Sequence, residues 1–505
     1  MEARRLPQDR DSMPGARRSA GRSPAPPAAP ARQAGHRLQM PGKQYYTWTG
    51  DVRSPRRQSS ARGAKGPPTL GAGAEGDGQV TVQKEIGPRR QRVLDALAHR
   101  TPDQVPVDFG GCATTGIHAS CVAALRDYYG LEKRPVKICE PFQMLGLIDD
   151  DLREAMGIDV IGVPGRGTIF GFENHDWRPW NFNGLEVLVS EDFRTATDPE
   201  TGDTLIYPKG DTTARPSGRM PKGGFFFDAI IRQQQIDTDR LDPEDNLEEY
   251  ALFTDRQLDD IEADILAANT GERAVFAAPV NTGLGDIALV PGAGLTDPRG
   301  VRDVAEWYML TRSQPDVVHR IFERVVEIGI ANLRKIHERV GEAIDVLYVC
   351  GTDFGTQRSA FCSVKTFDRL WKPHYAGLCR WVHANTTWKT FKHTCGSSER
   401  FFESMIDAGI DIVNPVQCSA AGMDPRMLKD KYKGRLVFWG GGIDTQHMLP
   451  FGAPAEVREQ VLERCEIFSE QGGFVFNSIH NVQANTPVGN IAAMIDAVKE
   501  FNGRR

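Results

Sequence analysis

Short apolar runs alternate with longer amphipathic stretches over most of the chain. The runs favour strands because they are rich in Val, Ile and Phe and stop at Gly, Pro, Asn or Asp. The longer stretches place apolar residues three and four positions apart, which is the spacing of one helical face. The pattern predicts eight strands, which begin near residues 105, 159, 274, 345, 388, 410, 435 and 473.

Helices are predicted between these strands. One is expected around Val93, Leu94 and Leu97, before the break at Thr101–Asp103. The others are expected over residues 118–129, 141–156, 255–268, 300–340, 365–385, 398–408, 424–431, 454–470 and 487–501.

Residues 167–260 interrupt this regular order. Brief polar–apolar alternations there are separated by turn residues, so the segment predicts a small antiparallel β insertion that ends in an acidic helix. Strands that alternate with helices predict a parallel sheet covered on both faces. Eight such units over residues 86–504 fit an α/β fold of the (β/α)8 TIM barrel type, and a doubly wound open sheet is the alternative.

Composition adds a boundary and excludes some function classes. Residues 1–80 hold 14 Lys and Arg against 6 Asp and Glu and few apolar residues, so residues 1–85 are expected to be a disordered basic tail. An inert or untranslated extension, a targeting peptide and a basic interaction arm are the alternatives for it. The rest of the chain carries 61 acidic residues against 47 basic ones, which argues against nucleic-acid binding.

Cysteine usage and hydropathy indicate the compartment. The nine cysteines are scattered and form no C-x-x-C pair, which favours a reducing environment. No apolar run reaches the roughly 18 residues of a membrane span, so a cytoplasmic protein without a membrane partner is expected. No G-x-G-x-x-G follows the first predicted strand and no G-x-x-x-x-G-K-[ST] occurs, so neither dinucleotide nor P-loop chemistry is indicated.

The candidate chemistry lies where the strands end. In a barrel the loops after the strands form one mouth, which carries the active site. Polar and thiol side chains occur after each of the last five predicted strands: Asp353 and Gln357, His393 and Cys395, Gln417 and Cys418, Gly441 and Asp444, and then Asn477, His480, Asn481 and Gln483.

His393 and Cys395 are the strongest candidates for metal ligands. Residues two apart on a strand point the same way, so an imidazole and a thiol converge there. Nitrogen and thiolate ligands suit Zn²⁺, and a third ligand from His480 or Cys418 would leave the open position of a catalytic site. The alternatives are a small buried hydrophobic residue for Cys418 and a hydrogen-bonded loop histidine for His480.

The remaining residues of the mouth are expected to act on substrate. Asp353 and His480 are the candidate catalytic residues, although Asp353 also suits a helix cap or turn. The candidate substrate-binding residues are Gln357, Gln417, Asn477, Gly441 and Asp444.

Six stretches together resemble the uroporphyrinogen decarboxylase superfamily, across most of residues 88–502. They are Arg92–Leu97, Thr101–Val107, Phe438–Asp444, Gly452–Val457, Gly472–Phe474 and Asn485–Ile491. The resemblance implies a (β/α)8 barrel. It also implies one of two activities, which are the cofactor-free decarboxylation of uroporphyrinogen and zinc-dependent methyl transfer between a corrinoid and a thiol.

Two positions favour the methyltransferase branch, which resembles the methylcobamide:coenzyme M enzymes. The decarboxylases carry an Arg-rich segment near the first strand, whereas Asp108–Thr115 contains no Arg here. The methyltransferases carry H-x-C, which His393–Cys395 matches, and a cysteine after the last strand, where this chain has His480. The decarboxylases also have a histidine there, so His480 alone does not choose a branch.

The resemblance therefore implies a zinc-dependent enzyme that moves a methyl group between a corrinoid, carried by a partner protein, and a small thiol or related acceptor. A cofactor-free uroporphyrinogen decarboxylase of porphyrin metabolism is the first alternative. A non-catalytic relative that binds a corrinoid or tetrapyrrole is the second.

Overall fold

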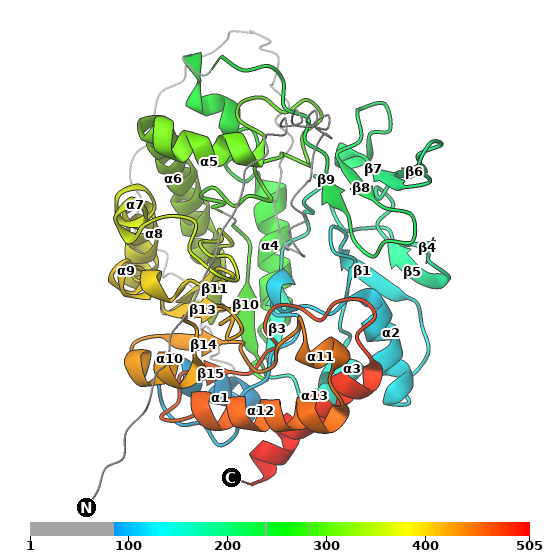
Figure 1. The fold of residues 1–505 in the computed structure, drawn as a ribbon, viewed down its shortest axis with the longest axis vertical. Helices are drawn as coiled ribbons and strands as arrows, with labels where there is room; N and C mark the ends of the chain where they lie inside the picture. Colours follow the sequence, from blue (N-terminus) through cyan, green and yellow to red (C-terminus); the bar gives the residue numbers. More distant parts are fainter. Residues whose placement is uncertain (1–84, 238–239, 281, 505) are drawn as a thin grey trace, which may run out of the picture. The chain divides into compact units, whose positions relative to one another are not determined.

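A computed structural model describes residues 85–237, 240–280 and 282–504 (Figure 1). The predicted basic tail lies outside the described residues except at Glu85, and the domain boundary near residue 86 stays a prediction. Among the described residues, no helix has the length and apolar content that a membrane crossing needs.

A curled, seven-stranded parallel sheet forms the centre of the fold, in the order β15-β14-β13-β12-β11-β10-β3. Its strands are β3 (Val160–Val163), β10 (Ala274–Ala277), β11 (Val346–Cys350), β12 (Lys389–His393), β13 (Ile412–Asn414), β14 (Val437–Trp439) and β15 (Phe474–Val475). Nearly every residue in them is buried, as expected for a parallel sheet that is covered on both faces. The predicted α/β fold with a parallel sheet is thereby confirmed.

The segment around Val107 takes the place of the first predicted strand. Asp108 N donates to Phe476 O (2.9 Å) beyond β15, and Asp159 N donates to Val107 O (2.8 Å) just before β3. The segment therefore joins both edges of the seven-stranded sheet, but it forms a single β-bridge, from Val107 to Phe476.

Local chemistry explains why this segment is not the full strand that was predicted. Pro106 has no backbone N–H. Side chains take the two neighbouring donors, because Val105 N donates to Asn502 Oδ1 and Val107 N to Asp159 Oδ2, both at 2.8 Å. The eighth position of the predicted barrel is thus filled by a bridging segment, and the sheet is not fully closed.

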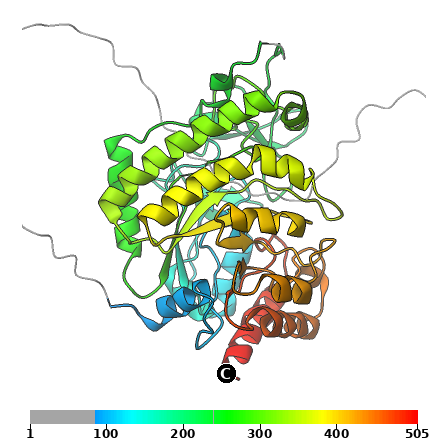
Figure 2. The same cartoon turned by 90° about the vertical axis from the view of Figure 1, so that its left-hand side faces the viewer.

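Thirteen α-helices occur among the described residues. They are α1 (Pro88–Leu97), α2 (Ala119–Tyr128), α3 (Asp150–Met156), α4 (Asp255–Ala268), α5 (Val304–Ser313), α6 (Pro315–Val340), α7 (Val364–Leu370), α8 (Lys372–Asn385), α9 (Phe402–Asp407), α10 (Pro425–Tyr432), α11 (Met448–Phe451), α12 (Pro454–Phe468) and α13 (Val488–Gly503). Figure 2 shows α6 and α8 side by side on the outside of the sheet. The long α6 buries Val318, Phe322 and Val325 on one face and exposes Glu323 and Arg324 on the other.

The predicted helix over residues 141–156 is correct only for its second half, α3. The first half holds a turn between β1 (Val136–Glu140) and β2 (Leu145–Gly146). The buried Glu140 side chain accepts hydrogen bonds from Phe142 N and Gln143 N, both at 2.8 Å. These two hydrogen bonds hold the turn between β1 and β2.

The expected β insertion contains strands of two small sheets (Figure 1). One sheet has the order β2-β1-β5-β4, with β4 (Arg178–Phe182) and β5 (Leu185–Val189) antiparallel to each other. The other is antiparallel, in the order β6-β7-β8-β9, and comprises β6 (Thr195–Thr197), β7 (Thr204–Ile206), β8 (Gly218–Met220) and β9 (Asp228–Ala229).

Alternation along the strands decides which side chains face the inside of the curled sheet. Tyr348 on β11 and Phe391 on β12 stack there, with ring centroids 5.8 Å apart. Leu347 instead belongs to the larger core that the helices cover. Because His393 follows Phe391 by two residues, β12 directs the His393 imidazole toward the inside of the mouth.

Candidate metal centre

His393 and Cys395 meet at the end of β12. His393 is the last residue of the strand, and Cys395 lies two residues into the following loop. Cys395 Sγ is 3.3 Å from His393 Nε2. Thr394 N donates to Asn414 O (2.8 Å), which holds the start of the loop against β13.

His480 reaches the same point from the loop after β15. Its backbone has a φ of +67°, and its ring centroid is 5.4 Å from that of His393. One ligand atom from each of His393, Cys395 and His480 lies within 4.8 Å of the other two. Among the described residues, these three form a group that could hold a metal ion. Ligand atoms around a tetrahedral zinc lie about 3.5 Å apart, so small movements would fit the three side chains to the ion.

Asparagine side chains contact both imidazoles. His393 Nδ1 is 2.6 Å from Asn414 Oδ1, and His480 Nδ1 is 2.7 Å from Asn481 Oδ1. An amide oxygen only accepts hydrogen bonds, so each Nδ1 carries a proton and Nε2 is the ring nitrogen left to bind a metal. Both histidines are therefore in the tautomer that binds a metal through Nε2.

Asp353 and Gln417 hold the loop that carries the thiol. Asp353 Oδ1 accepts a hydrogen bond from Cys395 N, and Gln417 Oε1 accepts one from Gly396 N, both at 2.6 Å. The same Asp353 oxygen is 3.9 Å from His393 Nε2. Two of the residues expected at the mouth thus fix the loop, Asp353 at the backbone of Cys395 and Gln417 at that of Gly396.

Burial keeps His393 neutral. Desolvation lowers the pKa of His393 to about 3, an effect that His480 reinforces and the nearby Asp353 carboxylate opposes. A neutral imidazole is the form that binds a metal ion, so His393 does not have to lose a proton first.

Cys418 lies outside this group. Its thiol donates to Val416 O (3.3 Å), and burial raises the pKa of Cys418 to about 12. A thiol held in the protonated form by its surroundings is a poor metal ligand.

The other expected substrate-binding residues lie in different environments. Gln357 is exposed, and Gly441, with a φ of +81°, packs against Val416. Asp444 caps a turn, because its Oδ1 accepts from Gln446 N (2.7 Å). Asn477 is fully buried and donates to Asp108 O (2.7 Å).

Asn414 is a site residue that sequence reasoning missed. It ends β13 and is paired with His393 across the parallel β12–β13 ladder. The signal that could have found it is its position at the end of a predicted strand, which is the criterion that selected His393 and Asn481.

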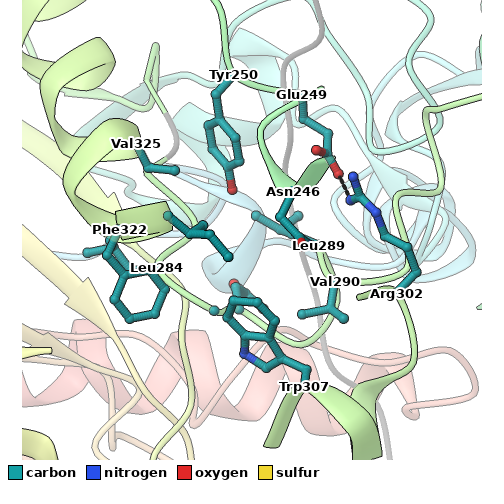
Figure 3. A pocket seen from close by; sticks show the side chains of 13 residues that line it. Asn246, Glu249, Tyr250, Leu284, Leu289, Val290, Arg302, Trp307, Phe322 and Val325 are labelled. Carbon is teal, nitrogen blue, oxygen red and sulfur yellow. Dashed lines mark hydrogen bonds and ion pairs between the residues drawn. The ribbon is translucent and has the colours of Figure 1, made fainter. Parts of the chain in front are cut away.

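A small cavity lies near the mouth, between α5, α6 and the loop after β10 (Figure 3). Its volume is about 30 Å³, and its polar lining includes Tyr250, Asp286 and the ion pair of Glu249 with Arg302. The volume holds one or two water molecules, so in this structure the cavity does not accommodate a corrinoid or tetrapyrrole.

Residues 294–501 match the family model for uroporphyrinogen decarboxylase (URO-D). His393, Cys395 and His480 all lie inside the matched range. The sequence resemblance to this superfamily is thereby confirmed.

The chain is also similar to several named relatives and solved structures. The uroporphyrinogen decarboxylases of three Coxiella burnetii strains are each 23% identical over 189 residues, or 37% of this chain and 49% of theirs. The chain thus spans about half the length of the curated relatives it matches. Among solved structures, a methyltransferase from Methanosarcina mazei is 14% identical with a TM-score of 0.46, covering 83% of this chain and 99% of its own. A dihydropteroate synthase from Xanthomonas albilineans is 19% identical with a TM-score of 0.21, over 30% of this chain and 52% of its own.

Proposed function

We propose that this protein is a zinc-dependent methyltransferase that transfers a methyl group between a corrinoid and a thiol or related small acceptor. The observation that carries the proposal is the convergence of His393, Cys395 and His480 within 4.8 Å at one mouth of an α/β fold. Three protein ligands leave the fourth position of a tetrahedral ion open, which is the mark of a catalytic rather than a structural site.

Zinc bound to these three residues would take the acceptor thiol in its open position and lower the pKa of that thiol, which makes it a nucleophilic thiolate. The chain would supply ring nitrogens from His393 and His480 and the sulfur of Cys395. Asp353 keeps Cys395 in place through the backbone N–H.

Asn477 is the best-supported candidate for a substrate contact. Its side chain is fully buried, and its Oδ1 has no hydrogen-bond partner in the described part of the chain. An unpaired buried acceptor is costly, so we propose that it accepts a hydrogen bond from bound substrate.

The test is a reaction of zinc-loaded full-length protein with methylcobalamin and a panel of small thiols. The thiolate attacks the methyl carbon and the cobalt–carbon bond breaks. Both electrons of that bond stay on cobalt, so the products are a thioether and cob(I)alamin. Cobalamin absorbance and mass spectrometry follow the two products. Zinc-dependent formation of both supports the proposal, and a rate equal to that of the protein-free mixture with every thiol contradicts it.

Uroporphyrinogen decarboxylation is a second candidate, which the names of the matched relatives favour. Its substrate carries several carboxylates, and Asp108–Thr115 provides no Arg or Lys near the first strand segment to neutralise them. We expect no turnover of uroporphyrinogen at rates normal for enzymes. Stepwise loss of CO₂ from uroporphyrinogen, detected by chromatography of the oxidised porphyrins, would favour this candidate over methyl transfer.

A further inference from the structure

The two imidazoles of the candidate metal centre are held in the same way. Each donates its Nδ1–H to an asparagine oxygen, in the pairs His393–Asn414 (2.6 Å) and His480–Asn481 (2.7 Å). Both asparagines are almost completely buried. The two pairs come from different parts of the sheet, since Asn414 ends β13 and Asn481 follows β15.

Hydrogen bonds fix the orientation of both amides. Asn414 Nδ2 donates to Trp439 O (2.8 Å), and Asn481 Nδ2 donates to Ala113 O (3.2 Å). An amide whose nitrogen faces a carbonyl must present its oxygen on the other side, which is where each histidine lies. The backbone therefore determines the tautomer of both histidines through the asparagines.

The loop after the first strand segment supports both asparagines at once. Ala113 supplies the carbonyl for Asn481, and Thr114 Oγ1 donates to Asn414 Oδ1 (3.2 Å). Ala113 and Thr114 lie in a short 3-10 helix, Ala113–Thr115, that is fully buried. Gln483 Nε2 adds a second hydrogen bond to Asn481 Oδ1 (2.9 Å).

We propose that Asn414 and Asn481 are positioning residues that hold His393 and His480 ready for zinc, and that the Ala113–Thr115 turn braces both. This inference rests on the proposed function, because it needs the metal centre to exist. Partners that orient ligating histidines commonly contribute 10- to 100-fold to metal affinity. The amides are also uncharged, so they orient the imidazoles without adding negative charge near the ion.

The experiment measures zinc affinity by competition with a chelator in Asn414→Leu and Asn481→Leu. We expect zinc to dissociate about 10- to 100-fold more readily from each variant than from the wild type. Cobalt substituted for zinc should give weaker, shifted visible bands, because the imidazoles no longer hold one geometry. Asn481→Asp keeps an acceptor oxygen and should bind zinc more tightly than Asn481→Leu does.

Asn490→Leu is the matched control. Asn490 is also buried and donates to two backbone carbonyls, Leu449 O (2.8 Å) and Gly452 O (2.9 Å), but it contacts none of the three ligands. It should lower the melting temperature of the metal-free protein and leave zinc affinity unchanged. If the leucine variants do not fold, Thr114→Val provides a milder test, with a several-fold loss of affinity expected.

The outcomes separate the two proposals. Wild-type protein that binds zinc, with leucine variants that bind it equally well, overturns the positioning role and leaves the proposed function in place. Wild-type protein that binds no zinc overturns the metal centre and this inference together. An equal loss of affinity in Asn490→Leu would also contradict the positioning role, because the effect would then be one of general stability.

Discussion

Gly396, directly after Cys395, is the position where a single added methyl group should disturb both the fold and the site. Its φ is +81°, which lies in a backbone region that residues other than glycine rarely adopt. A Cβ there would clash with the backbone carbon and oxygen of Gly355 and lie 2.7 Å from Thr356 O. Backbone atoms cannot swing away as a flexible side chain does, so the two loops must separate.

The magnitude of the Gly396→Ala effect has two parts. The positive φ costs about 1–2 kcal/mol for an L-residue. Separating the loops, which Ser397 N joins to Thr356 O at 2.8 Å, costs about 1–3 kcal/mol more. We therefore expect the free energy of unfolding to fall by about 2–5 kcal/mol.

The difference between Gly396→Ala and Gly422→Ala isolates the second part, the cost of separating the loops. Gly422 has a φ of +74°, yet nothing lies within 4 Å of its Cβ position, so its replacement carries the backbone cost alone. Urea denaturation, followed by circular dichroism and tryptophan fluorescence, compares the two variants when both probes give one transition with equal m values. If Gly396→Ala is as stable as Gly422→Ala, the close approach of the two loops does not constrain the fold and the reasoning is refuted.

Two further predictions concern buried charges elsewhere in the fold. Burial raises the pKa of Glu140 from about 4.5 to about 8, so the folded state keeps a proton that the unfolded state releases, and stability should fall as the pH rises between these values. Glu140→Gln should flatten this slope in thermal melts at pH 5 and pH 8, and an unchanged slope would contradict the assignment. Arg90 is 3.0 Å from the buried carboxylate of Asp345, and Arg90→Ala should lower the free energy of unfolding by about 3–5 kcal/mol because that charge is left unpaired. Arg458→Ala is the control, because Arg458 is exposed and paired with Glu500, and it should lower the free energy of unfolding by under about 1 kcal/mol in urea denaturation. Equal losses in the two variants would count against the burial argument.

Hydrophobic periodicity predicted the parts of the fold that depend on it most. The 26-residue α6 has a continuous apolar face, and β10, β11, β14 and β15 are apolar runs buried on both sides. Both patterns are local, so they can be recognised without knowing what packs against them. The first predicted strand was wrong because a distant side chain, Asp159, takes the backbone donor of Val107. The helix predicted from residue 141 was wrong in its first half, where Glu140 holds a turn before β2.

The site likewise has features that a local sequence pattern predicts and features that depend on long-range contacts. The convergence of His393 and Cys395 was predicted from the two-residue period of a strand, although Cys395 lies in the loop after β12. Asn414 reaches His393 only because of the register between β12 and β13, which is a long-range property. The support from Ala113 and Thr114 depends on contacts across 300 or more positions of the chain, which no local pattern reports.

The most direct test of the central claim is the zinc content of the purified full chain, compared with Cys395→Ala, His480→Ala and Cys418→Ala. We expect about one zinc per wild-type chain. Cys395→Ala and His480→Ala should lose most of it while keeping the wild-type circular dichroism spectrum, and Cys418→Ala should keep its zinc. Wild-type protein that remains metal-free when produced and purified with ample zinc would contradict the account, as would a loss of zinc in Cys418→Ala with full retention in His480→Ala.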